Sequence, residues 1–588
     1  MVAVIFFDYC IKMKLFFETV FRLKKRQILY RIYYILSNIS LFKKIKGTRY
    51  LLDSNRQLKK IKPSYDLLQV YLKNLSKNNF FEDSSTKINK SGVITLNFLN
   101  QKHKLNHHKW EYNSHSILWN YTLNYMHWLE FFLAEDIKNN NKNNLPVIEN
   151  ILFNWSKYKS DISMRSYPTS LRLLVWLKIF SFYKIKNKQL IKSFTFQYIY
   201  LKNNIEYELD ANHLLENLIS LYSCSKFLDI PKDIKKYEDF LLKEIDNQFD
   251  KNELHYERSF AYHFAIIPRL YLIYFLSNSS LRARIKKILC SANILLEKFS
   301  NKEGVYLFHD ATYDMYPQID KLKKIISPFK YEKKLNSIDS GYYLQESKTF
   351  KLCIDVGNPS PSYQPGHYHC SMTSYIIDYL GKPLIIDSGV YEYYLDDVRR
   401  YLSRKTSSHN VMSIDSREQS NIWSIFRLGN SASINNFSIE ENSSYDILRI
   451  EYIAFPELGY RRCKRLFIIN KSFFRIHVID FVANKEPNHI KSFLILNPTY
   501  KHETKEGIIC LNEEDNKLYL KSENKVLSEK HEIYKRMGHI DSTTKFSIEN
   551  TEPSSPIVSY CISDNKQAIE YRIEENILRI DDHRIELN

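Results

Sequence analysis

The sequence predicts a protein of two unlike parts, a set of stacked helical hairpins followed by an antiparallel β-sandwich. From about residue 106 to about residue 301, apolar residues recur three and four positions apart, which is the period of amphipathic helices. After about Gly341 the apolar runs become short, alternating or β-branched, and turn residues separate them. A length of 588 residues also exceeds what one hydrophobic core usually holds, so more than one domain is expected.

Local signals place several of the elements. Pro168 suits the first turn of a helix, and Asn212 is predicted to cap another helix, with Glu216 in its first turn. The charged stretch Asp320–Ser340 is predicted to link the two parts. Strands are predicted at Val411–Ile414, Ile447–Ala454, Leu466–Asn470, Phe474–Ile479 and Ser492–Ile495.

These patterns divide the chain into a basic N-terminal helical arm (1–60), a helical domain (61–330) and a β-sandwich domain (331–588). Residues 11–46 are basic and aromatic. We expect them to pack on the helical domain, and the alternative is that they lie on a membrane surface. The apolar runs are far shorter than the ~20 residues of a membrane span, and no clear signal peptide is expected.

Composition excludes some classes of function. Only 12 glycines occur, and neither phosphate-binding loop motif is present, so no nucleotide cofactor is expected. The net charge of +19 suits a polyanionic partner, although a solvated lysine surface explains it equally well. No nucleic-acid-binding motif accompanies the charge. Eight scattered cysteines without a CxxC pair indicate buried free thiols.

Five short clusters carry side chains suited to catalysis or metal binding. A tyrosine near a cation can act as a base, and two histidines two residues apart share one face of a strand. Such a histidine pair suits proton transfer or metal binding, and aspartate and histidine at strand ends complete a set of donors fit for zinc. The clusters are Asn212–Asn217, His255–His263, Pro365–Cys370, Leu384–Gly389 and Arg404–Val411.

The order of these clusters resembles the heparinase II/III family, whose members carry similar segments in the same succession. The segments are SYPTSLRLLVWL, NHLLEN, HYERSFAYH, PGHYHC, IIDSG and SSHNV, and the match runs from about Trp110 to about Gly429. The resemblance implies an incomplete (α/α) toroid joined to an antiparallel β-sandwich, with the active site in the cleft between them. It also implies a polysaccharide lyase that cleaves a uronate-containing acidic glycan by β-elimination and leaves 4,5-unsaturated uronate ends.

The resemblance assigns roles to individual residues. Asn212 would neutralise the uronate carboxylate, while Tyr262 and His367 would form the acid–base pair, in an order that stays open. Residues expected to contact substrate are His213, Glu216, Glu257 and Arg404, and the residues that match the ligands of a structural zinc are His369, Asp387 and His409.

Two positions depart from the family pattern: Ser371 stands where an acid is usual, and Val411 stands where a threonine is usual. No redox cofactor is required. Two alternatives remain open. One is a glycoside hydrolase using Glu216 and Glu257, and the other is a non-catalytic glycan-binding or assembly protein of surface-polysaccharide production. The resemblance favours the periplasm, with the cytoplasm as the alternative, and the oligomeric state is left open.

Overall fold

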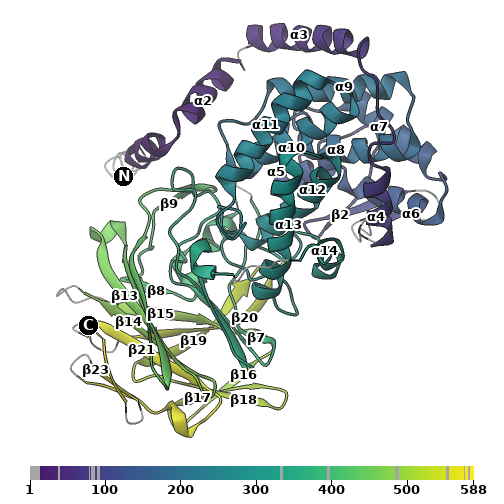
Figure 1. The fold of residues 1–588 in the computed structure, drawn as a ribbon. Helices are drawn as coiled ribbons and strands as arrows, with labels where there is room; N and C mark the ends of the chain where they lie inside the picture. Colours follow the sequence, from purple (N-terminus) through teal and green to yellow (C-terminus); the bar gives the residue numbers. More distant parts are fainter. Residues whose placement is uncertain are drawn as a thin grey trace.

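The computed structural model shows a helical domain and a β-domain lying side by side, with the N-terminal helices along one edge of both (Figure 1). Within residues 40–47, and at 51 and 88, only the backbone is described. The described residues are 13–37, 40–78, 80, 86–88, 93–330, 335–393, 397–483, 489–550, 552, 555–574, 577–580 and 583–587.

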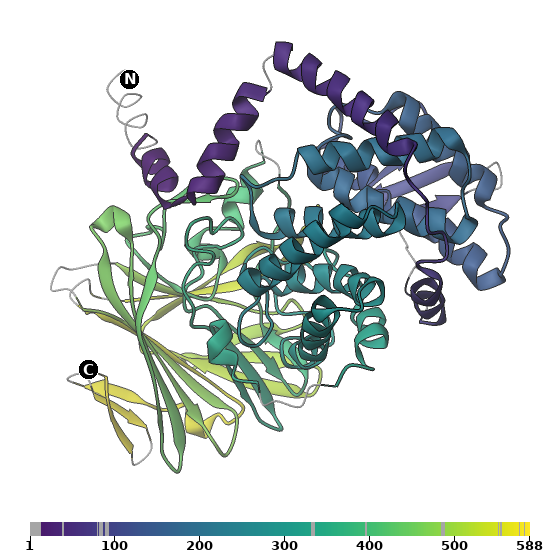
Figure 2. The ribbon, with the colours of Figure 1, turned by 45° about the horizontal axis from the view of Figure 1, so that its top comes forward.

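The N-terminal arm consists of a helical stretch over residues 13–22, helix α2 (Lys25–Ser37) and helix α3 (Ser40–Leu58). Figure 2 shows these purple helices running along the outside of the molecule, from the β-domain to the helical domain. Residues 1–12 of the predicted arm lie outside the described part. No helix of the described chain is long and apolar enough to cross a membrane.

The helical domain packs its hairpins around buried aromatic residues, among them Trp119, Trp155 and Trp176. Its helices are α4 (Gln69–Lys77), α5 (Ile117–Tyr125), α6 (Glu130–Asn139), α7 (Leu145–Tyr158), α8 (Ser166–Tyr183), α9 (Lys188–Asn203), α10 (Ala211–Phe227), α11 (Pro231–Gln248), α12 (Phe260–Leu276), α13 (Ser280–Lys298) and α14 (Ile319–Ile326).

Three local predictions for this domain need correction. Asp210 rather than Asn212 caps α10, because its carboxylate accepts the Ala211 N–H at 3.0 Å, and Glu216 consequently lies beyond the first turn. The predicted linker contains helix α14, whose apolar face is buried in the helical core. A small antiparallel sheet of short strands also precedes the hairpins: β1 (Thr86–Ile88), β2 (Ile94–Phe98) and β3 (Gln101–Lys104).

Antiparallel sheets dominate the chain from residue 342 onward. The largest has the order β11-β12-β13-β14-β21-β18-β17-β16, and its strands are β11 (Ser433–Glu441), β12 (Tyr445–Ala454), β13 (Arg461–Asn470), β14 (Arg475–Val482), β21 (Ile557–Ser563), β18 (Asn516–Lys521), β17 (Ile508–Glu513) and β16 (Lys501–Lys505). A second sheet has the order β19-β20-β15-β8, with β19 (Lys525–Ile533), β20 (Asp541–Glu549), β15 (Ile490–Ile495) and β8 (Met412–Ile414).

A third sheet joins the second, because the Ile386 N–H donates to the Ile495 carbonyl. It consists of β4 (Tyr342–Glu346), β5 (Phe350–Asp355), β6 (Tyr375–Tyr379) and β7 (Lys382–Ile385). Two minor sheets complete the domain. One pairs β9 (Ile422–Ser424) with β10 (Arg427–Leu428), and the other consists of β22 (Arg572–Glu574), β23 (Ile577–Ile580) and β24 (His583–Glu586).

The predicted change from helices to strands near Gly341 is confirmed. All five predicted strand segments fall on or within one residue of observed strands. In the described part of the β-domain, the one α-helix is α15 (Val398–Leu402). Side chains from the three larger sheets form one apolar core, as expected of a sandwich whose inner faces are buried.

Arg258, just before α12, ties the two domains together. Its guanidinium contacts the Asp355 carboxylate at 2.5 Å and donates to the carbonyls of Gly341 (2.7 Å) and Asn358 (3.0 Å) in the β-domain. A Cβ atom added at Gly357 would displace the Arg258 guanidinium from these contacts. Arg258 therefore links the two domains through three polar contacts at their boundary.

The buried pair Arg465–Asp480 yields a stability prediction for the sandwich. Both side chains are inaccessible, and the guanidinium donates to both carboxylate oxygens at 2.7 and 2.6 Å. Arg465→Met should lower the free energy of unfolding by about 3–5 kcal/mol, because Asp480 loses its counter-charge in the core. Arg417→Met removes an exposed pair with Glu457 and should cost less than about 1 kcal/mol. Denaturant titration would show this contrast, and equal losses would contradict it.

Candidate active site

Tyr262 and His367 meet at the boundary of the two domains. Tyr262 is the third residue of α12, and the Ser259 hydroxyl accepts its N–H at 3.3 Å as the helix cap. His367 comes from the loop between β5 and β6. The two rings lie 4.1 Å apart between centroids, and the Tyr262 hydroxyl donates to the Tyr393 hydroxyl at 3.0 Å. Two residues predicted to act together are therefore in contact.

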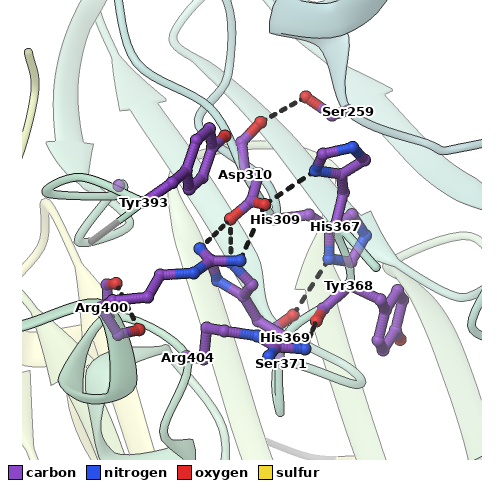
Figure 3. Close-up of polar contacts among 12 residues, drawn as sticks. Ser259, His309, Asp310, His367, Tyr368, His369, Ser371, Tyr393, Arg400 and Arg404 are labelled. Atoms are coloured by element: carbon purple, nitrogen blue, oxygen red, sulfur yellow. Dashed lines mark hydrogen bonds and ion pairs between the residues drawn. The ribbon is translucent and has the colours of Figure 1, made fainter. Parts of the chain in front are cut away.

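A buried carboxylate, Asp310, holds His367 in place (Figure 3). The His367 Nδ1–H donates to Asp310 Oδ2 at 2.8 Å, and the His369 Nε2–H donates to Oδ1 at 2.7 Å. Arg400 donates to both oxygens, at 3.0 Å for Oδ2. Asp310 thus accepts from three cationic or protonated partners at once.

The Arg400 guanidinium keeps Asp310 ionised. Burial alone raises the pKa of a carboxyl group, but Arg400 and the two histidine hydrogen bonds outweigh it and hold the pKa of Asp310 well below its usual value. Because the carboxylate carries no proton, the histidine nitrogens that face it must be the donors. In the neutral form of His367 the other ring nitrogen, Nε2, then carries no proton.

The backbone of Asp310 is fixed as firmly as its side chain. Its N–H donates to the His367 carbonyl at 3.1 Å, and its carbonyl accepts from the Ser259 hydroxyl at 2.6 Å. Ser259 therefore connects the cap of α12, which carries Tyr262, to the residue that orients His367. The positions of the two rings depend on one another through this connection.

The segment Pro365–Cys370 is a loop rather than the predicted strand. His367 and His369 still point the same way, because both bond to Asp310 rather than because a strand alternates their side chains. Ser371, which replaces the usual acid, lies 3.3 Å from His309 Nδ1 (Figure 3). His369 thus receives its orienting carboxylate from the helical domain and not from its own segment.

Asn212 and His213 open helix α10, which packs against α12. The Asn212 side chain is nearly buried and has no hydrogen-bond partner among the described residues. His213 stacks on Tyr167 with ring centroids 4.3 Å apart, and its Nδ1 lies 3.3 Å from Glu206. Although burial opposes it, Glu206 and, to a lesser extent, Glu257 raise the pKa of His213.

The two predicted cleft glutamates have different surroundings. Glu257 Oε1 lies 3.6 Å from His367 Nε2, and burial raises the pKa of Glu257. Glu216 is paired with Arg269 at 3.3 Å, and burial raises its pKa too. One carboxylate oxygen of each glutamate is buried without a hydrogen-bond partner in the described structure. Glu257 therefore lies beside the acid–base pair, while Glu216 lies beside a cation.

Arg404 does not fit its predicted role of substrate contact. The side chain is fully buried, and it donates to the carbonyls of Tyr368 at 3.0 Å and of Ser424 at 2.8 Å. These bonds hold the His367 loop against the segment before β10. Arg400, one helical turn earlier, is the arginine that reaches the site (Figure 3).

The three predicted zinc ligands lie together. The ring centroids of His369 and His409 are 5.2 Å apart, and His409 Nδ1 donates to Asp387 Oδ2 at 2.7 Å. His369 Nδ1 and His409 Nε2 are both buried without a partner, and burial lowers the pKa of His369 to about 3. Even so, within the described residues no three histidine, cysteine, aspartate or glutamate side chains are arranged to hold one metal ion.

Asp310, Arg400 and Tyr393 were missed by the sequence analysis. Asp310 lies in a loop after α13 with no surrounding pattern of its own, so only its position in the fold reveals it. Arg400 lies four residues before the cluster Arg404–Val411. The signal that could have found it is the run of basic residues just before a histidine at a strand end. All seven described cysteines are free, as predicted.

The fold and these contacts define a class of protein: a helical toroid joined to a β-sandwich, with a tyrosine–histidine pair at the junction. Residues 336–554 match the family model described as Heparinase II/III-like, C-terminal. This match lies within the β-domain and supports the predicted resemblance to the heparinase II/III family there.

Solved structures share this architecture along nearly the whole chain. One heparinase III is 14% identical, over 90% of this chain and 91% of its own, with a TM-score of 0.67. The heparan sulfate lyase HepC from Pedobacter heparinus is 14% identical, over 94% and 98%, with a TM-score of 0.53. At such identities the likeness establishes the fold, so the prediction of toroid and sandwich is confirmed. No curated protein matches the sequence itself.

Asp310 and Arg400 should be energetically coupled. Asp310→Asn leaves the Arg400 guanidinium buried without a counter-charge and should cost about 3–5 kcal/mol of unfolding free energy. The double variant Asp310→Asn/Arg400→Met should lose about 0.5–3 kcal/mol less unfolding free energy than the two single variants lose together. Denaturant titrations of the four proteins measure this cycle. Arg399→Met, at the neighbouring exposed residue, is the control and should change little. Strictly additive losses would show that the pair does not support the site.

Proposed function

We propose that this protein is a polysaccharide lyase that cleaves a uronate-containing acidic glycan by β-elimination. The observation that carries the proposal is the contact between Tyr262 and His367 at the boundary of the two domains. Elimination breaks the C5–H and C4–O bonds of the uronate and forms a C4=C5 double bond. It therefore needs one base and one acid beside the same sugar ring.

The protonation states of the pair favour one division of labour. Asp310 holds the proton of His367 on Nδ1, which leaves Nε2 bare and able to take the C5 proton. Burial raises the pKa of Tyr262 well above its ordinary value, so its hydroxyl stays protonated and can donate to the departing O4. We therefore assign His367 as the base and Tyr262 as the acid.

Asn212 supplies the third part of the proposed chemistry. The C5 proton is weakly acidic while the neighbouring carboxylate is charged, so a donor to that carboxylate stabilises the enolate that forms. The Asn212 amide is nearly buried and has no partner in the described structure, and such a group gains a hydrogen bond when a ligand arrives. We assign it this role.

A glycoside hydrolase would need two carboxylates on opposite sides of the scissile bond. Both candidate glutamates come from the helical domain, and Glu216 is paired with Arg269, which favours the lyase. A net charge of +19 suits an acidic glycan as the partner. The periplasm is the compartment that we propose on the family resemblance.

We also propose a structural zinc ion at His369 and His409. Each histidine donates one N–H to a carboxylate, Asp310 or Asp387, and its other ring nitrogen is buried without a hydrogen-bond partner. Metal-binding histidines are commonly oriented in this way. Asp387 would become a third ligand on releasing His409. When bound, zinc would supply a fixed link between the His369 loop and the strand ends that carry Asp387 and His409.

The lyase proposal is tested by the formation of unsaturated uronate, which absorbs in the ultraviolet. The purified chain should release this chromophore from at least one of heparan sulfate, alginate, hyaluronan or the host's own surface polysaccharide. Tyr262→Phe should lower turnover at least about a hundredfold with little change in KM, because only the acid hydroxyl is lost. Tyr274→Phe, farther along the same helix, is the matched control and should retain activity.

Each other outcome has a definite meaning. Reducing ends without absorbance would indicate hydrolysis and contradict elimination. Glycan binding without any cleavage would indicate a binding or assembly protein. Near-normal activity of Tyr262→Phe would reject our assignment of the acid, even if the lyase activity itself were present.

The zinc proposal is tested by metal analysis of the purified protein. We expect about one zinc per chain, lost in His369→Ala and His409→Ala, and a lower melting temperature after chelation. His539→Ala changes an exposed histidine outside the site and should keep the metal. A metal-free wild-type protein that gains no stability when zinc is added would contradict the site.

A further inference from the structure

Helix α2 of the N-terminal arm presents an apolar face to solvent. Leu29, Ile32 and Leu36 follow the spacing of one helix face, and their exposed fractions are 66, 51 and 53%. A surface helix normally turns such a face toward the core. In α2 the apolar face instead points to solvent, over a length of about 20 Å.

The polar face of α2 is the one bound to the protein. Gln27 is fully buried, and its Nε2 donates to Gln364 Oε1 at 2.8 Å, while the Tyr34 hydroxyl donates to the Ile205 carbonyl at 2.7 Å. Arg31 donates to the Glu208 carbonyl at 3.1 Å. These polar contacts fix the rotation of the helix, so the outward position of its apolar face is determined by the fold.

The helical stretch before α2 repeats this arrangement. Leu15 and Leu23 are buried, and Leu15 lies against Gly429 of the β-domain, while Phe16, Phe17 and Phe21 are exposed by 48, 50 and 85%. The Arg22 guanidinium donates to the Gly429 carbonyl at 2.8 Å. Each of the two helical segments thus carries an outward apolar set. We call the two sets together the arm surface, made of Phe16, Phe17, Phe21, Leu29, Ile32, Ile35 and Leu36.

The arm is also strongly basic. Residues 13–58 contain eleven lysines and arginines against two acidic residues, Glu18 and Asp53, so they carry +9 of the chain's net charge of +19. Lys14 and Lys25 are exposed beside the arm surface. Figures 1 and 2 show the arm at the outer edge of the molecule, where no other described part of the chain covers it.

We propose that the arm surface docks on a membrane containing anionic lipid. Outward aromatic and aliphatic side chains flanked by lysines are what an interfacial helix presents to headgroups and acyl chains. A second copy of this chain would bring the same positive charge against the arm, which disfavours pairing through it. The inner polar contacts reach both domains, so the docked arm would hold the whole protein at the bilayer.

The test is sedimentation of the full chain with vesicles of phosphatidylcholine alone or mixed with phosphatidylglycerol. We expect at least tenfold tighter binding to the anionic vesicles, weakened by salt. Leu29→Ser/Ile32→Ser/Leu36→Ser should reduce binding at least tenfold. Lys14→Gln/Lys25→Gln should weaken it on the order of fivefold per lysine. The matched control, Val147→Ser/Leu380→Ser/Leu527→Ser, changes apolar residues elsewhere that are exposed by 41, 47 and 42%, and it should bind as the wild type does.

Three outcomes would overturn the proposal. The wild-type chain could fail to sediment with anionic vesicles, or the arm variants could bind them as well as the wild type. Light scattering could instead reveal a dimer that the triple serine variant dissociates, without vesicle binding, and a second copy would then be the partner. The lysine variant keeps the test decisive if the serine variant folds poorly.

Discussion

The buried Asp310 carboxylate is the constraint on which the proposed active site depends. A charged group without access to water is stable only when cations and hydrogen-bond donors surround it, and here Arg400, His367 and His369 do so. The same contacts set the tautomers of both histidines. The contacts that stabilise the buried charge are therefore the same contacts that orient His367 for its proposed role.

The reacting groups come from two domains, so the domain junction decides whether they meet. Tyr262 belongs to the helical domain and His367 to the β-domain, and Ser259 and Asp310 connect them. Arg258, next to Ser259, anchors the same turn to Asp355 across the junction. One short segment at the start of α12 thus supplies the anchor, the cap and the proposed acid.

The N-terminal arm extends this arrangement to the outside of the molecule. Lys24 contacts Asp210 at 3.0 Å, and Asp210 caps the helix that carries Asn212. Lys24 also donates to Tyr363 of the β-domain at 3.0 Å. If the arm docks on a membrane, the surface that anchors the protein is bonded to both walls of the cleft, and substrate at the same membrane would find the cleft held nearby.

The sequence by itself determined the division into helices and strands, because periodicity of apolar residues reflects which face of each element is buried. It also singled out Tyr262, His367, His369, Asp387 and His409, through the short motifs that contain them. It could not locate Asp310 or Arg400, because a lone carboxylate in a loop and an arginine beside a motif have no distinctive pattern.

Only the tertiary structure decided which side chains face the cleft. Arg404 and Arg400 look alike in sequence, yet one bonds to backbone carbonyls and the other to Asp310. The Pro365–Cys370 segment brings two histidines together through a shared partner and not through strand alternation. The arm was expected to pack on the helical domain, with a membrane surface as the alternative, and the structure turns the polar face of α2 to the protein and its apolar face to solvent. Each of these positions depends on hydrogen bonds to residues distant in sequence. Such residues become neighbours only when the chain folds, so the sequence pattern does not reveal them.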